Sequence, residues 1–304
     1  MRRREFLGAA AGAFVAAEIA AAQALPFPVI DTHIHLFDPT RPQGVPWPPK
    51  TDKVLYRPAL PERYRKIAEP FGVIGAIEIE CSPWLEDNQW VLDVEAKDKI
   101  MVGTIGDLEP GKPEFRAQLE RFHRNSLFLG IRCGNLWGRN LAAEIAKPAF
   151  VEDLKALAAG GLVLDTANQT PELIAATLRV TDAVPDLRIV IDHLPQMTAP
   201  ADTNLRELGK RPQVYVKVSE VLRRVNGQVP LDLAGYKPRL DEIFGIFGED
   251  RVLFGSDWPN CDNWAPFGAG FGVVREYFMA KGRAVAEKYF RTNSVKAYRW
   301  RERS

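Results

Sequence analysis

Apolar residues gather in short, continuous runs along this chain, and the runs are rich in Val, Ile and Leu. Within a run the apolar positions follow one another and do not alternate with polar ones. Such runs are typical of parallel strands that are buried on both faces. The pattern predicts eight strands, at residues 29–32, 73–79, 100–105, 127–132, 162–165, 187–192, 214–219 and 251–255.

Helical spacing of apolar positions appears between most of these runs, and several of these segments open with Pro, Asp or Glu, which favour a helix start. Eight strands that alternate with helices favour an α/β fold with a single (β/α)8 TIM barrel. A doubly wound sheet is the alternative, but no G-x-G-x-x-G pattern follows the first strand. The clearest helices are predicted at 86–97, 113–125, 149–159, 171–183 and 237–247.

Two connections between predicted elements are unusual in composition. Residues 38–61 contain seven Pro residues around Trp47, so no regular helix fits there and the loop is long for a turn. We expect it to form a wall or lid beside the end of the first strand, with an ornamental surface loop as the alternative. A second stretch, 259–271, contains Trp264 and Phe267 and is expected to close the same opening from the other side.

The composition is that of a globular protein. The chain has 304 residues, of which 46% are hydrophobic and 26% charged, which excludes a disordered or fibrous protein. Its start resembles a twin-arginine export signal: Arg3 and Arg4 precede an Ala-rich apolar run that ends in a small-x-small cleavage pattern at 22–24. We predict a signal peptide at 1–24, a barrel domain at 25–304 and export to the periplasm or to the extracellular space. A retained amphipathic helix is the alternative.

The charge balance argues against some classes of binding partner, and the cysteines argue against disulfides and a thiol nucleophile. Removal of residues 1–24 leaves equal numbers of acidic and basic side chains, so nothing favours nucleic acid, and the apolar run is too short and too rich in Ala for a stable membrane anchor. The three cysteines, Cys81, Cys133 and Cys261, have no paired spacing, so we expect no disulfide framework. None has an adjacent base, so none is expected to be a nucleophile. The oligomeric state stays open.

Two of the four histidines, His33 and His35, lie at the end of the first predicted strand. Side chains two apart on a strand project from the same face, and the functional groups of a barrel collect where its strands end. The other strand ends are also polar. We therefore expect a shared site that draws on Glu80, Arg132, His193, Lys217 and Asp257.

Three segments of the chain resemble the amidohydrolase superfamily, most closely its branch of barrel lactonases, which act on 2-pyrone-4,6-dicarboxylate and sugar-acid lactones. Each motif alone is weak, but together and in order they are specific, and the likeness extends from about residue 29 to residue 295. The segments are Asp31-Thr32-His33-Ile34-His35, Asp192-His193-Leu194-Pro195 and Leu253-Phe254-Gly255-Ser256-Asp257-Trp258-Pro259.

This resemblance implies the catalytic residues. His33, His35, His193 and Asp257 are expected to surround the scissile carbonyl, with Asp257 as the general base on water and the imidazoles orienting the carbonyl and stabilising its oxygen. Ester hydrolysis needs a base and donors aimed at an oxyanion, and a carboxylate among imidazoles supplies both. The alternatives are that Asp257 caps a helix and that His193 is a hydrogen-bonded core residue.

The chain departs from the metal-dependent members of the superfamily at the fifth predicted strand. Those enzymes carry a Lys or His there, whereas residues 162–169 contain neither. Because the resembled lactonase branch works without metal, we expect no cofactor. Zinc or another divalent ion is the alternative, since three or four N and O ligands suffice, and its ligands would be His33, His35, Asp257 and His193.

The substrate-binding groups are expected among the charged residues of the strand ends. Arg132, Lys217 and Arg223, or its neighbour Arg224, could clamp a carboxylate or a sugar hydroxyl. Glu80 could pair with one of these cations or bind a hydroxyl. We therefore predict a hydrolase that opens a small-molecule lactone. A metal-dependent amidohydrolase or decarboxylase and an exported binding protein without catalysis are the alternatives.

Overall fold

The computed structural model describes residues 25–167, 169–194 and 201–303. The signal peptide expected at 1–24 lies outside the described residues and stays a prediction. No helix in the described ranges has both the length and the apolar character that crossing a bilayer requires.

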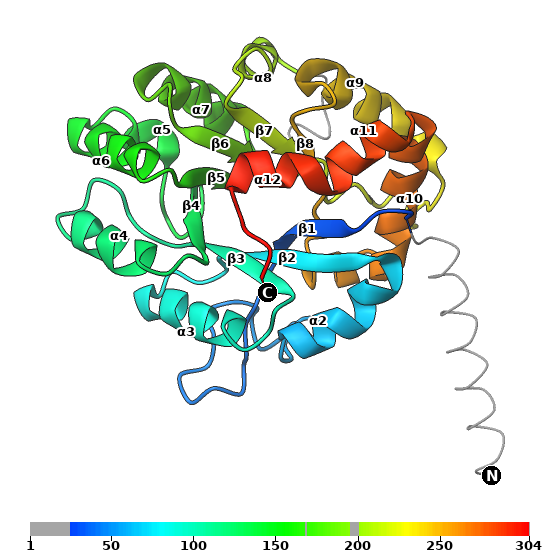
Figure 1. Cartoon of the computed structure of the whole chain (residues 1–304), viewed down its shortest axis with the longest axis horizontal. Helices are drawn as coiled ribbons and strands as arrows, with labels where there is room; N and C mark the ends of the chain where they lie inside the picture. The colour runs from blue at the N-terminus through cyan, green and yellow to red at the C-terminus, as the bar shows by residue number, and fades with distance from the viewer. Residues whose placement is uncertain (1–24, 168, 195–200, 304) are drawn as a thin grey trace.

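Eight parallel strands form one sheet in which each strand pairs with its neighbour in sequence. All eight were predicted, and each bound lies within two residues of the observed one. The single (β/α)8 TIM barrel is therefore confirmed (Figure 1). The strands are β1 (Val29–Ile34), β2 (Val73–Ile79), β3 (Met101–Gly106), β4 (Phe128–Gly134), β5 (Val163–Ala167), β6 (Arg188–Ile191), β7 (Val214–Lys217) and β8 (Val252–Leu253).

Helices surround the sheet and cover its outer face, which is why the strand sequences are apolar on both sides (Figure 1). The five predicted helices correspond to α3, α4, α6, α7 and α9. The helices are α2 (Pro61–Ala68), α3 (Leu85–Glu95), α4 (Phe115–His123), α5 (Leu141–Glu144), α6 (Pro148–Ala159), α7 (Pro171–Ala183), α8 (Thr203–Leu208), α9 (Lys237–Phe247), α10 (Phe267–Ala280), α11 (Arg283–Glu287) and α12 (Asn293–Tyr298).

The segment that follows β8 closes the barrel against β1. Backbone hydrogen bonds run from Thr32 N to the Phe254 carbonyl at 3.0 Å, from Asp257 N to the His33 carbonyl at 2.9 Å, and from His35 N to the Trp258 carbonyl at 2.7 Å. A Cβ atom at Gly255 would lie 2.8 Å from His33 Cβ, so glycine allows this close approach. The closure places Asp257 directly beside the two histidines of β1.

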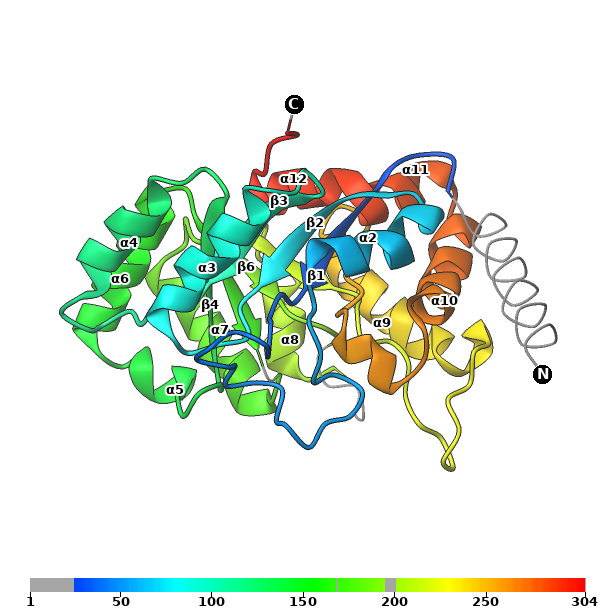
Figure 2. The same ribbon diagram turned by 90° about the horizontal axis from the view of Figure 1, so that it is seen from below.

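The two ends of the barrel differ in character. Apolar side chains from all eight strands, among them Ile30, Val163 and Leu253, fill the interior together with Tyr298 and Trp300 from the end of the chain. Figure 2 shows α12 at one end and the long loop after β1 (blue) and the loop after β7 (yellow) at the other. The strands end at the second face, which is where a barrel places its active site.

An antiparallel bridge between Phe37 and Ala59 holds the two ends of the Pro-rich loop at 38–61 together. The stretch at 259–271 differs from the irregular segment that we expected. A 3-10 helix, Asn260–Asn263, occupies its middle, and α10 begins at Phe267. The three cysteines are unpaired, as predicted.

Candidate active site

Asp31 opens the first motif, and its side chain ties β1 to the segment after β8. One carboxylate oxygen, Oδ1, accepts hydrogen bonds from the backbone N–H groups of His33 at 3.1 Å and Ser256 at 2.8 Å. The other, Oδ2, accepts from the Tyr64 hydroxyl at 2.7 Å. Asp31 is fully buried. It therefore fixes the backbone that carries His33 and Asp257, and it does not face a substrate.

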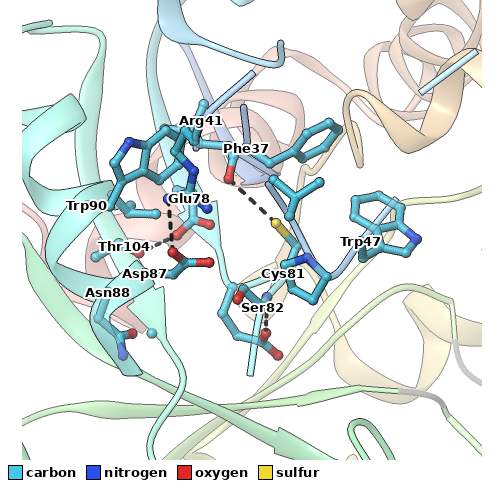
Figure 3. Close-up of a pocket in the computed structure, with 16 residues that line it drawn as sticks. Phe37, Arg41, Trp47, Glu78, Cys81, Ser82, Asp87, Asn88, Trp90 and Thr104 are labelled. Atoms are coloured by element: carbon cyan, nitrogen blue, oxygen red, sulfur yellow. Dashed lines mark hydrogen bonds and ion pairs between the residues drawn. The ribbon is translucent and has the colours of Figure 1, made fainter. Parts of the chain in front are cut away.

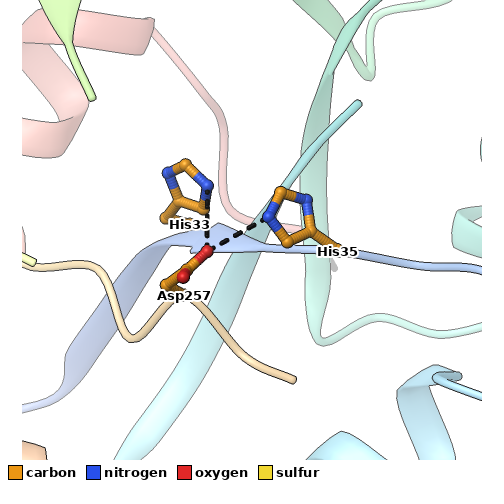
Figure 4. Close-up of side chains that lie close together, drawn as sticks. All are labelled: His33, His35 and Asp257. Carbon is orange, nitrogen blue, oxygen red and sulfur yellow. Dashed lines mark hydrogen bonds and ion pairs between the residues drawn. The ribbon is translucent and has the colours of Figure 1, made fainter. Parts of the chain in front are cut away.

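The predicted convergence of His33, His35 and Asp257 is present in the structure (Figure 4). Asp257 Oδ1 lies 3.1 Å from His35 Nε2 and 3.4 Å from His33 Nε2. The alternative role considered for Asp257, a helix cap, is not observed, because neither helix that follows it has a side-chain cap hydrogen bond. His35 Nδ1 lies 2.7 Å from the Ile79 carbonyl oxygen, so Nδ1 donates there and the neutral ring turns a lone pair at Nε2 toward Asp257.

The ends of β6, β7 and β8 add a second group of side chains around Asp257. His193, Glu220 and Asp257 offer ligand atoms within 4.8 Å of one another. Their backbones share one unusual feature, a left-handed conformation with φ of 62°, 49° and 59°. Non-glycine residues adopt this conformation at a cost of about 1–2 kcal/mol each. Strained residues of this kind cluster at active sites, where the surrounding structure holds them in place.

A cavity of about 280 Å³ opens in front of this group. His35, His193, Glu220 and Asp257 line it, and Trp47 forms part of its wall. Trp47 packs edge-on against the His35 ring, with centroids 5.7 Å apart. The Pro-rich loop therefore does form a wall of the cavity. His193 lines the cavity and is not a core residue.

Several lining residues were not singled out from the sequence. Glu220 lies at the end of β7, and its position after a strand was the only signal that could have pointed to it. Trp137 follows β4 and donates from Nε1 to Glu80 Oε2 at 3.1 Å. Leu136 and Asn260 also line the cavity. These residues lie in loops or, for Asn260, in a short 3-10 helix, where hydrophobic periodicity carries no information.

Burial sets the protonation of the central pair. It lowers the pKa of His35 to about 4, and the nearby Arg132 cation adds to this effect. Burial also raises the pKa of Asp257 well above its usual range; the nearby His193 lowers this pKa, and the neighbouring Glu220 carboxylate raises it further. Two acceptor atoms, His35 Nε2 and Asp257 Oδ1, thus face each other at 3.1 Å, a contact that requires a proton or a cation between them.

Arg132 lines the cavity as predicted, but carboxylates of the protein already surround its guanidinium. Its Nε donates to Glu80 Oε1 at 3.0 Å, and its Nη1 lies 3.3 Å from Asp192 Oδ2. Burial lowers the pKa of Arg132, but the two carboxylates outweigh this effect and raise it overall. Of the two roles considered for Glu80, the structure shows the ion pair.

Lys217 does not have the place that was expected for it. Its side chain is fully buried below the cavity, and its ammonium lies 2.7 Å from Asp165 Oδ2 and 2.8 Å from Asp192 Oδ1. A substrate in the cavity does not reach it, so a direct clamp by Lys217 is wrong. His33 is likewise fully buried behind Asp257 and does not line the cavity.

Arg223 is also outside the cavity lining, which corrects its predicted role. Its Nη1 donates to the carbonyl oxygens of Glu220 and Leu222, and its Nη2 lies 3.8 Å from Glu220 Oε2. The alternative, Arg224, is exposed and donates to the Asn263 carbonyl at 3.3 Å. Both arginines support the loop after β7.

His33, His35 and Asp257 have a donor set that fits a divalent ion, since two imidazole nitrogens and a carboxylate oxygen converge within 4.8 Å. His33 Nε2 and Asp257 Oδ2 are buried and make no hydrogen bond of standard geometry within the described ranges. Unpaired buried polar atoms are costly unless a ligand or water satisfies them. The fourth expected ligand, His193, belongs to the neighbouring group with Glu220 and the same Asp257.

A second, smaller space lies between the Pro-rich loop, β2 and α3 (Figure 3). Its volume of about 20 Å³ holds one water molecule and no substrate. Cys81 Sγ points to the Leu36 carbonyl oxygen at 3.5 Å, and burial raises the pKa of this thiol well above its usual range. These values agree with the expectation that Cys81 is not a nucleophile.

Comparison with known proteins agrees with this geometry. The family model described as amidohydrolase matches residues 30–300. An L-fucono-1,5-lactonase of Burkholderia ambifaria is 27% identical over 242 residues, which cover 76% of this chain and 80% of that protein.

Solved structures share the fold. An amidohydrolase from Burkholderia multivorans with bound zinc superposes with a TM-score of 0.79 at 20% identity, covering 90% of this chain and 100% of the other. A 2-pyrone-4,6-dicarboxylic acid hydrolase from Pseudomonas putida, described as putative, gives a TM-score of 0.70 at 21% identity, covering 90% and 98%.

Proposed function

Because this chain belongs to the amidohydrolase family and is a hydrolase, we propose that it opens the ring of a lactone, a cyclic carboxylic ester. The observation that carries this proposal is the contact of Asp257 with His33 and His35 at the inner end of a cavity that His193 also lines. Similarity to an L-fucono-1,5-lactonase supports it. An ester needs a base for water and a donor for the carbonyl oxygen, and this group provides both.

Each residue has a different task in the proposed reaction. Asp257 in its ionised form takes a proton from water while the water oxygen bonds to the acyl carbon. The C–O bond of the ring then breaks, and the ring oxygen receives that proton, which gives a hydroxy acid. His35 shares the proton of Asp257 at rest. His193 Nδ1 lies 2.9 Å from Ser219 Oγ, and when Ser219 donates to it, Nε2 carries the hydrogen that polarises the carbonyl.

The charges around the cavity favour an uncharged substrate. Arg132 is the single Lys or Arg side chain among the described residues that line it, and Glu80 and Asp192 already neutralise it. Glu220 and Asp257 add carboxylates to the same wall. A substrate that carries carboxylates would therefore meet like charge without a vacant cation, whereas hydroxyl groups can bond to these carboxylates.

We therefore expect the enzyme to prefer neutral polyhydroxylated lactones to lactones that carry carboxylates. The value of kcat/KM for a sugar-acid lactone should exceed that for 2-pyrone-4,6-dicarboxylate by about 100-fold or more, because uncompensated like charge costs several kcal/mol. Ring opening at constant pH, followed through the release of acid, measures both values. Equal or better turnover of the dicarboxylate would contradict the charge argument, and failure of every lactone would contradict the proposed function.

The earlier expectation of no metal is not supported, because a solved structure with the same fold holds zinc. In this chain we propose that His33, His35 and Asp257, with His193 nearby, would hold such an ion, which would supply a Lewis acid next to the carbonyl when bound. After treatment with a chelator the chain should take up zinc, as measured by metal analysis after gel filtration. His35→Ala should lower zinc affinity by at least about 10-fold, since even indirect partners of a ligand matter that much.

A matched control is available for this measurement. His123 is exposed on α4, so His123→Ala should bind zinc as the unchanged protein does. Equal zinc affinity in the His35 and His123 variants would exclude this site. The activity of the chelator-treated protein, assayed with and without added zinc, then tells whether hydrolysis needs the ion.

A further inference from the structure

Lys217 and His33 form a contact deep in the barrel that the proposed reaction does not explain. Lys217 Nζ lies 3.2 Å from His33 Nδ1, and both side chains are fully buried. The same ammonium group donates to Asp165 Oδ2 at 2.7 Å and contacts Asp192 Oδ1 at 2.8 Å. The Tyr298 hydroxyl donates to the same Asp165 oxygen at 2.9 Å. The ammonium group thus contacts two carboxylates and one imidazole nitrogen.

A charged ammonium group has three hydrogens and no lone pair. At 3.2 Å from Lys217 Nζ, the Nδ1 atom of His33 can therefore only accept a hydrogen bond. A hydrogen on Nδ1 would point at the hydrogens of the ammonium group. The competing acceptor for such a hydrogen, Asp192 Oδ1, is farther away, at 3.5 Å.

We propose that Lys217 holds His33 in the tautomer with its hydrogen on Nε2, and that Lys217 is thereby a positioning residue for Asp257. The Nε2–H group of His33 then lies on the side of Asp257, with Nε2 3.4 Å from Oδ1. His35 has the opposite tautomer, because its Nδ1 donates to the Ile79 carbonyl. One Asp257 oxygen thus meets a donor from one imidazole and an acceptor from the other.

The tautomer also governs metal binding. An imidazole nitrogen binds a metal ion through its lone pair, so His33 can become a ligand only if its hydrogen moves from Nε2 to Nδ1. That move replaces the contact with Lys217 by a bond from Nδ1 to Asp192. Lys217 therefore weakens metal binding at His33, because the ion has to displace this contact. His35 Nε2 and Asp257 meet no such competition.

The tautomers can be observed directly by long-range ¹H–¹⁵N correlation spectra of the full chain labelled with ¹⁵N-histidine and treated with a chelator. His33 should show a protonated Nε2 and an unprotonated Nδ1, and His35 should show the reverse pattern, which serves as an internal reference. Spectra of His33→Asn and His35→Asn assign the two rings. A protonated Nδ1 on His33, or an imidazolium, would overturn the proposal.

A variant gives the second test. Lys217→Met keeps the length of the side chain and removes the charge, so His33 should shift toward the Nδ1–H tautomer and zinc affinity should rise by about 10-fold or more. Lys237→Met, on the exposed face of α9, is the matched control and should leave zinc affinity unchanged. Unchanged or weaker zinc binding by a folded Lys217→Met protein would contradict the role of Lys217. If that variant does not fold, the tautomer of His33 in the spectra of the unchanged chain tests the proposal.

This inference rests on the proposed function only for its catalytic meaning. A chain with the two predicted tautomers but without lactone hydrolysis would refute the function and keep the role of Lys217. Lactone hydrolysis with His33 in the other tautomer would support the function and refute the role of Lys217.

Discussion

Asp257→Asn is expected to lower kcat for lactone hydrolysis by about 1,000-fold or more, because the amide cannot take a proton from water. The change keeps the size of the side chain and its place beside His33 and His35. KM should change little, since the amide oxygen occupies the same position. Steady-state kinetics with the best sugar-acid lactone measure both values.

The fold should survive this change. Burial raises the pKa of Asp257 above its value in an unfolded chain, so ionising this carboxyl group costs stability in the folded state. Stability therefore falls as the pH rises from the unfolded pKa through the raised folded pKa, and a neutral amide removes that loss. The melting temperature at pH 7 should be unchanged or higher.

Asp232→Asn is the matched control for this prediction, because Asp232 is exposed in the loop before α9. It should retain full activity. A folded Asp257→Asn protein with more than a tenth of the original kcat would show that another group activates the water. Glu220, which lines the same cavity, would then be the first residue to test.

The fold could be predicted from the sequence because the strands of a barrel are buried on both faces. Runs such as 73–79 and 214–219 are continuous and apolar for that physical reason, and the observed β2 and β7 fall within them. The positions of His33, His35, His193 and Asp257 could be predicted for a related reason. Each lies near or just after the end of a strand, and all strands of a parallel barrel end on the same face.

The partners of the buried charges could not be predicted in the same way. The pattern indicated that Arg132 and Lys217 point inward, and a cation near a cavity suggested a substrate clamp. Asp165 lies on β5, and Glu80 and Asp192 directly follow β2 and β6; their carboxylates are close enough to neutralise both cations. Which cation meets which carboxylate depends on the stagger between strands, and an apolar run does not show the stagger.

The backbone conformations of the site were also outside the reach of sequence patterns. His193, Glu220 and Asp257 adopt left-handed φ values; His and Asp are enriched among the non-glycine residues that do so, but Glu is not. The surrounding contacts hold this conformation in place, among them the hydrogen bond from Asp257 N to the His33 carbonyl. Glu220 was missed for this reason, because its side chain reaches the cavity only through that turn.

Arg132→Met is expected to lower the free energy of unfolding by about 3–5 kcal/mol, because it leaves Glu80 buried without the cation that pairs with it and leaves Asp192 with Lys217 as its one remaining cation among the described residues. The guanidinium is buried. It donates from Nε to Glu80 Oε1 at 3.0 Å and from Nη2 to the Glu80 backbone carbonyl at 2.8 Å. Methionine fills much of the volume of the arginine side chain, so the loss of stability measures the removal of the positive charge and not the creation of a cavity. Urea unfolding followed by tryptophan fluorescence measures it.

An exposed ion pair provides the control for this effect. Arg121 pairs with Glu86 at 2.7 Å, and both side chains are well exposed, so Arg121→Met should cost no more than about 1 kcal/mol. The double variant Arg132→Met with Glu80→Gln should recover part of the loss, because it removes the carboxylate that lost its cationic partner. If Arg132→Met were as stable as Arg121→Met, the guanidinium could not be neutralising Glu80 and Asp192. The cavity would then have a cation available for an anionic substrate, and the preference for neutral lactones would lose its physical basis.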